Sequence, residues 1–76
     1  MEALKVLIGD GSSFMRIMLT TALESLGLKV VATAKDSQEA VDKYLEFKPH
    51  IALLDLAIAD VSDFKTDNAN VSENNI

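Results

Sequence analysis

Short apolar runs alternate with longer amphipathic stretches along the first part of the chain. Residues 4–8 (LKVLI) form a short run with branched apolar side chains, and the glycines of residues 9–11 indicate a turn after it. We therefore predict a buried strand over residues 4–8. Residues 29–34 and residues 51–54 have the same character and predict two further strands.

The stretches between these strands predict two helices. After Ser12 or Ser13, either of which can accept from free backbone amides as an N-cap, apolar residues recur at helical spacing. Gly27 stands where such a helix commonly ends, because glycine tolerates the left-handed conformation. A capping-box pattern beginning at Asp36 predicts the start of the second helix, and Pro49 predicts its end.

The order strand, helix, strand, helix, strand predicts an α/β domain with a parallel sheet and right-handed crossovers. We expect the first helix to place Phe14, Met15 and Met18 in the core. We expect His50, just before the third strand, to be a solvated surface residue.

The chain divides into a periodic part, residues 1–59, and a polar C-terminal tail, residues 60–76. Asparagine and serine are poor helix formers, so the tail is expected to be frayed; the alternative is a short segment that docks on a partner. With 76 residues and no cysteine, the chain is at most one small domain without disulfides.

Charge and hydropathy exclude two classes of partner. The formal net charge is -5, so the chain has no basic footprint for nucleic acid. Apolar residues make up 49% of the chain, but no uninterrupted run approaches a bilayer span and the N-terminus does not read as a signal peptide. We therefore expect no membrane association and a cytoplasmic location.

Two aspartates follow predicted strands. Asp10 comes after the first strand and Asp55 ends the third, so the two side chains converge if these strands are neighbours in a parallel sheet. Paired carboxylates suit a hard divalent ion such as Mg²⁺, and an aspartate beside it can act as a nucleophile towards a phosphoryl group. The alternative is that both are ordinary turn or cap residues.

Three segments resemble the receiver domains of response regulators, particularly those of the chemotaxis type. They are residues 7–16 (LIGDGSSFMR), 34–41 (AKDSQEAV) and 48–56 (KPHIALLDL), and the resemblance holds in register over residues 4–59. It implies the N-terminal half of a flavodoxin-like receiver fold, with the first strand between the second and the third.

The resemblance also implies roles for particular residues. Asp55 corresponds to the aspartate that a histidine kinase phosphorylates, and Asp10 to the first of two acids in the Mg²⁺ pocket. The main-chain carbonyl of Ala57 corresponds to a further metal ligand. A receiver of this kind is a signal transduction module, and we expect no enzymatic activity on a separate substrate.

Several departures from the family weaken this site. Gly11 stands where the second acid usually lies, Gly9 replaces an apolar strand residue and should loosen that strand end, and Ala59 replaces a proline. The hydroxyl residue of the family's fourth strand and the lysine of its fifth have no counterpart in the sequence. We therefore expect weak Mg²⁺ binding, and slow or absent phosphorylation of Asp55.

A half-domain leaves apolar surface uncovered. The third strand should expose Ile51, Leu53 and Leu54, so we expect a homodimer that completes the fold, with a histidine kinase or a full-length response regulator as further partners. An alternative function is a phosphorylation-independent interaction module that competes with full receivers. A dinucleotide-binding enzyme is disfavoured, because Phe14 occupies the third glycine position of that fingerprint.

Overall fold

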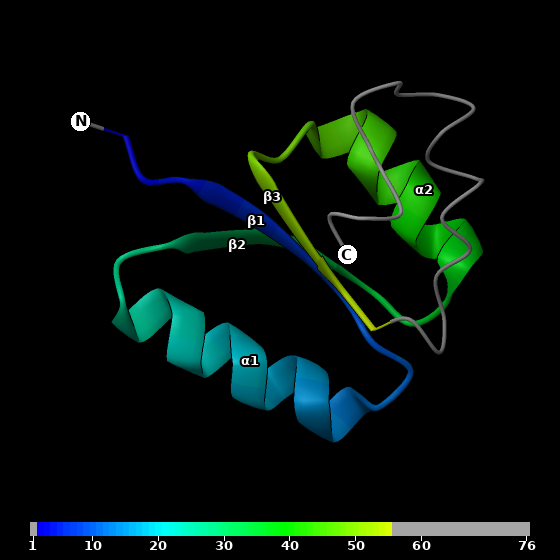
Figure 1. Cartoon of the computed structure of the whole chain (residues 1–76), viewed down its shortest axis with the longest axis horizontal. Helices are drawn as coiled ribbons and strands as arrows, with labels where there is room; N and C mark the ends of the chain where they lie inside the picture. Colours follow the sequence, from blue (N-terminus) through cyan, green and yellow to red (C-terminus); the bar gives the residue numbers. More distant parts are fainter. Residues whose placement is uncertain (1, 56–76) are drawn as a thin grey trace.

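The chain forms a parallel sheet with a helix on each side, as a computed structural model describes it for residues 2–55 (Figure 1). The strands are β1 (Lys5–Gly9), β2 (Lys29–Ala34) and β3 (Ile51–Leu54), and the helices are α1 (Ser13–Ser25) and α2 (Ser37–Phe47). The sheet order is β2-β1-β3, which confirms the predicted α/β topology with the first strand in the centre. The tail of residues 60–76 and the expectations for Ala57 and Ala59 lie outside the described residues.

β1 pairs with β2 along its whole length and with β3 from Val6 to Gly9. Its last residue, Gly9, pairs with Ala34 of β2 and with Leu54 of β3. The strand therefore continues one residue further than predicted, and Gly9, where a looser strand end was expected, is paired on both sides. The register irregularity lies at the other end of the strand, between Val6 and Leu7, opposite β2.

Local signals at the helix ends act largely as the sequence predicts. Ser12 caps α1, its side chain accepting from the Met15 amide at 3.2 Å. Gly27 has a φ of 89°, the left-handed conformation that glycine adopts without steric cost. Asp36 caps α2 and accepts from the Glu39 amide at 2.9 Å.

The C-terminal end of α2 contains a strained residue. Lys48 adopts a left-handed conformation with φ 46°, and its N–H still donates to the Tyr44 carbonyl at 2.9 Å. The following Pro49 disfavours the right-handed helical region for Lys48, which agrees with the helix ending there. The left-handed conformation itself was not predicted, because glycine or asparagine usually occupies such a position.

The core on the α2 side of the sheet is well formed. Leu7, Ala34 and Ala40 are fully buried, and the half-buried residues Ala32, Val41, Tyr44 and Leu54 pack against them. Leu54 therefore packs against this core, in contrast to its predicted exposure.

The α1 side of the sheet is only partly covered. Val6 and Ile8 are buried, but α1 itself has no buried residue: Phe14 is 67% exposed and Met18 is 50% exposed. The prediction that these side chains and Met15 form core is therefore wrong. The half-buried residues of the helix are Arg16, Leu19, Thr20 and Leu23. The side of α1 that carries Phe14, Ile17 and Met18 therefore faces outwards.

The third strand leaves apolar side chains open on this same side. Ile51 and Leu53 are 41% and 42% exposed, as predicted. They pair in register with Val6 and Ile8, which face α1, so all four lie on one face of the sheet. Within residues 2–55, no helix is long and apolar enough to cross a membrane.

Candidate functional site

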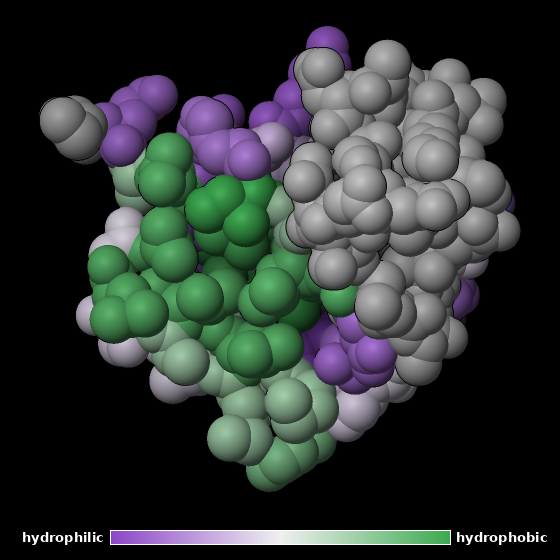
Figure 2. Space-filling view, in the orientation of Figure 1, coloured by the Kyte–Doolittle hydropathy of each residue, from purple (hydrophilic) through white to green (hydrophobic). Residues whose placement is uncertain are grey.

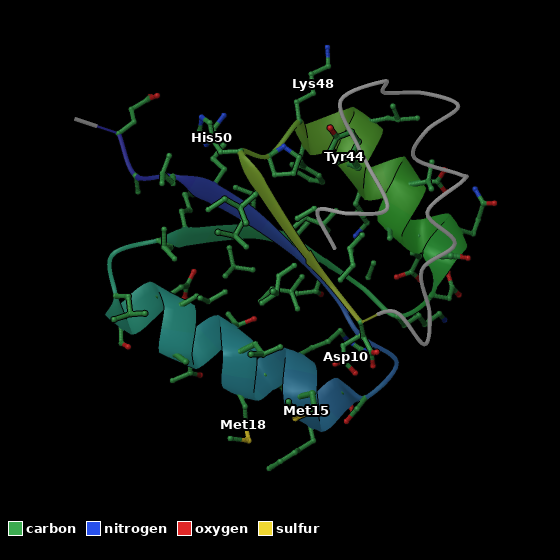
Figure 3. All side chains as sticks on the ribbon, viewed as in Figure 1. Asp10, Met15, Met18, Tyr44, Lys48 and His50 are labelled. Atoms are coloured by element: carbon green, nitrogen blue, oxygen red, sulfur yellow. The ribbon has the colours of Figure 1, made fainter. Side chains whose placement is uncertain are left out.

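The two aspartates singled out in the sequence lie at the same edge of the sheet. Asp10 follows β1 and Asp55 follows β3, and these strands are parallel neighbours. The Asp55 amide donates to the Gly9 carbonyl at 2.8 Å, so the β1–β3 ladder continues up to the aspartate. Figure 3 shows Asp10 where these two strands end. The predicted juxtaposition of Asp10 and Asp55 follows from this pairing.

Asp10 is held from three directions. Its amide donates to the Ala34 carbonyl at 3.0 Å, and its Oδ1 accepts from the Ser12 amide at 2.8 Å. Its carbonyl accepts from Arg16 Nη1 at 2.6 Å. Among residues 2–55, no hydrogen bond is made to Asp10 Oδ2, which leaves one carboxylate oxygen for a ligand.

The donor set suits a hard cation in part. Two carboxylates of adjacent strands supply oxygen ligands of the kind that Mg²⁺ prefers, and Mg²⁺ readily keeps several waters. The described residues contain no group of three or more histidine, cysteine or acidic side chains that could hold a metal ion. Gly11, exposed beside Asp10, provides no third carboxylate. Ala57, the expected main-chain ligand, lies outside the described residues.

Sequence reasoning missed two side-chain contacts near the ends of these strands. Arg16 carried no predicted role, yet it contacts the Asp10 carbonyl directly. His50 is exposed as expected, but its Nδ1 accepts from the Lys5 amide at 2.9 Å while its own amide donates to the Lys5 carbonyl at 2.9 Å. His50 is therefore a structural link between β1 and β3. Neither contact has a local sequence signal, because each depends on tertiary placement.

An open parallel sheet with a strand order of 2-1-3 and an acid pair at its carboxyl edge defines a class, that of flavodoxin-like receiver modules. No family model matches the chain. Individual curated proteins are similar to it in sequence. The chain is 38% identical over 58 residues to the chemotaxis protein CheY of Thermotoga maritima, covering 76% of this chain and 48% of that protein. It is 42% identical over 53 residues to a protein-glutamate methylesterase/protein-glutamine glutaminase of Archaeoglobus fulgidus, covering 70% of this chain and 15% of that protein.

Solved structures agree with the fold. A CheY in a CheX–CheY–BeF₃–Mg²⁺ complex from Borrelia burgdorferi superposes with a TM-score of 0.75 at 30% identity, covering 91% of this chain and 57% of that chain. The anti-anti-sigma factor PhyR from Bartonella quintana gives a TM-score of 0.77 at 27% identity, covering 93% of this chain and 31% of that chain.

The chain is homologous to the receiver domains of CheY and of the methylesterases, the receiver family of two-component signalling. It spans about half the length of the CheY relatives it matches. Gly9, at the end of β1, and the following residues 10–11 accordingly belong to a receiver-like segment and not to a dinucleotide-binding fingerprint.

Proposed function

We propose that the chain is a receiver-like signalling module in which Asp55 accepts a phosphoryl group from a histidine kinase. The observation that carries this proposal is the pairing of β1 with β3 up to the Asp55 amide, which donates to the Gly9 carbonyl at 2.8 Å and so brings Asp55 to the same sheet edge as Asp10. The homology to CheY supports the same role for Asp55.

In the proposed reaction, a carboxylate oxygen of Asp55 attacks the phosphorus of the donor. An O–P bond forms to give an acyl phosphate, and the N–P bond of the donor phosphohistidine breaks, with the leaving imidazole regaining a proton. When bound, Mg²⁺ offsets the negative charge on the phosphoryl oxygens. Asp10, Asp55 and the main-chain carbonyl of Ala57 would hold it. Each phosphoryl group modifies one Asp55 side chain. We therefore propose that the chain is a phosphoacceptor and not an enzyme that acts on a separate substrate.

The proposed Mg²⁺ site is weak. Only two carboxylates are available from the described residues, and Gly11 leaves the side of Asp10 without a further acid. Fewer charged ligands lower the affinity for a hard cation.

We also propose a cytoplasmic location, because the ATP from which a histidine kinase makes its phosphohistidine is found there.

The test is phosphorylation by acetyl phosphate in the presence of Mg²⁺, followed by intact mass spectrometry. The parent chain is expected to gain one phosphoryl group that is lost on mild base treatment. Asp55→Asn, a nearly isosteric change, is expected to gain none. Asp42→Asn, at another exposed aspartate in α2, should behave like the parent. A folded parent with no adduct would overturn the phosphoacceptor proposal.

A second candidate function is binding without phosphate, through a homodimer. Figure 2 shows apolar side chains gathered over α1 and the adjoining sheet. Phe14, Ile17, Met18, Ile51 and Leu53 are between 41% and 67% exposed, which corresponds to about 500 Å² at roughly 200 Å² for a large side chain. A standard interface needs about 800 Å² from each partner, so this face supplies most of one.

The chemistry of this face suits a second copy. Arg16 is the one charged residue of α1 before Glu24, so two such faces meet without strong charge repulsion despite the net charge of -5. Sedimentation velocity should give a dimer for the parent and a monomer for Ile17→Glu. Leu45→Glu makes the same change at an exposed leucine on α2, across the sheet, and should stay dimeric. A parent chain that is still monomeric at about 100 µM would refute the dimer.

A further inference from the structure

The Arg16 side chain reaches back from the first turn of α1 to the loop that carries Asp10. Its Nη1 donates to the Asp10 carbonyl at 2.6 Å in a half-buried position. The backbone of Arg16 is itself fixed, because its amide donates to the Ser12 carbonyl at 3.0 Å and its carbonyl accepts from Thr20 Oγ1 at 2.7 Å. The guanidinium therefore acts on the loop from a defined position.

The carbonyl that Arg16 contacts belongs to the peptide between Asp10 and Gly11. Glycine has the widest conformational freedom of any residue, so this peptide would otherwise rotate easily. Its rotation would also displace the Ser12 amide, which donates to Asp10 Oδ1 at 2.8 Å and orients the carboxylate. A charge-assisted hydrogen bond from Arg16 holds the peptide plane in place.

We infer that Arg16 is a positioning residue for the cation site, fixing the Asp10–Gly11 peptide so that the free oxygen of the Asp10 carboxylate stays oriented towards the cation. This inference rests on the proposed function, since it assumes a cation held between Asp10 and Asp55. It assigns a role to Arg16 that acts through Asp10 and not through contact with the phosphoryl group.

The charge of Arg16 allows a test, because its charge and its positioning contact should affect the Mg²⁺ affinity in opposite directions. A positive charge close to a cation site repels the cation, so removing the charge alone would strengthen binding. Removing the positioning contact weakens binding, and loss of a partner that orients a metal ligand typically lowers affinity by about 10-fold or more. Arg16→Met keeps most of the length and apolar stem of the side chain while removing both charge and donor.

The experiment is an NMR titration of the uniformly ¹⁵N-labelled chain with MgCl₂ alone, following the amides of residues 9–12. We expect the parent to bind Mg²⁺ and Arg16→Met to bind it about 10-fold more weakly. Arg16→Lys retains a cationic donor and should recover part of the affinity. Lys29→Met removes the same charge at the start of β2, the opposite end of the sheet, and should leave the affinity unchanged.

A second readout needs no metal. The Ser12 amide should exchange with solvent faster in Arg16→Met than in the parent, while the amides at the centre of β1 keep their protection. If urea titrations show that Arg16→Met is not folded, the Mg²⁺ affinity and the Ser12 amide exchange of Arg16→Lys are compared with those of the parent instead.

The outcomes separate the two proposals. A parent that binds no Mg²⁺ overturns the proposed cation site, and this inference with it. A parent that binds Mg²⁺, together with an Arg16→Met variant that binds equally well or better and shows unchanged Ser12 exchange, overturns the role of Arg16 alone.

Discussion

Replacing Leu7 by alanine should remove much of the stability of the domain. Leu7 is 0% exposed and lies in the core cluster with Ala34 and Ala40, two small residues that cannot fill the space it would vacate. Truncating a buried leucine costs about 2–5 kcal/mol through lost transfer free energy and the cavity left behind. At about 0.1 kcal/mol per residue, a domain of this size has a free energy of unfolding of about 5 kcal/mol in total.

The matched control is the same substitution at Leu4, just before β1. Leu4 is 49% exposed, so its burial contributes only about half of the free energy of a fully buried leucine. Leu4→Ala should therefore lower the free energy of unfolding by about 1 kcal/mol or less. The two variants remove the same atoms from the same segment of chain. Their difference therefore reports the packing around Leu7 and not a change in strand propensity.

The assay is urea unfolding followed by far-ultraviolet circular dichroism. With a slope of about 1 kcal/mol per M for a small domain, Leu7→Ala should lower the midpoint by about 2 M or more, and Leu4→Ala by about 1 M or less. Protein concentration must be the same for all three chains, because association of the folded state raises the apparent stability. Equal shifts for the two variants would refute the placement of the core between the sheet and α2.

Three further substitutions test local features. Asp36→Ala removes the N-cap of α2 and should cost about 1 kcal/mol in thermal or urea unfolding, whereas Asp42→Ala within the same helix should be neutral or slightly stabilising; equal effects would contradict the cap. Lys48→Gly should raise the melting temperature, because φ 46° is strained for lysine; a lower melting temperature would show that the residue is not held there. His50→Ala leaves the Lys5 amide without its side-chain acceptor and should cost about 1 kcal/mol, with faster exchange of that amide, and an unchanged exchange rate would contradict the link.

The fold was largely predictable because it depends on short-range signals. Strand positions, the Ser12 and Asp36 caps and the turn at Gly27 each follow from a few neighbouring residues, and the strand order follows from a resemblance with specific motifs. The orientation of α1 was not predictable in the same way. Its apolar residues occur on most sides of the helix, so periodicity identifies a helix without fixing which side meets the sheet.

The same distinction applies to the site. The proximity of Asp10 and Asp55 needed only the strand order, since parallel strands bring their carboxyl ends to one edge. The contacts of Arg16 and His50 depend on where a long side chain ends after folding. Arg16 in particular lies on the half-buried side of α1, and the periodicity of the helix did not identify that side.

The position of Asp55 ties the candidate site to the most exposed part of the sheet. β3 has four residues, and of these only Leu54 is even half-buried, so its separation from β1 costs less than unfolding of the α2-side core. Any ligand that requires both Asp10 and Asp55 binds only when β3 is paired with β1, and therefore stabilises that pairing. A partner that covers Ile51 and Leu53 stabilises the same pairing. By linkage, covering of this face and occupancy of the acid pair favour each other, with an equal coupling free energy in both directions.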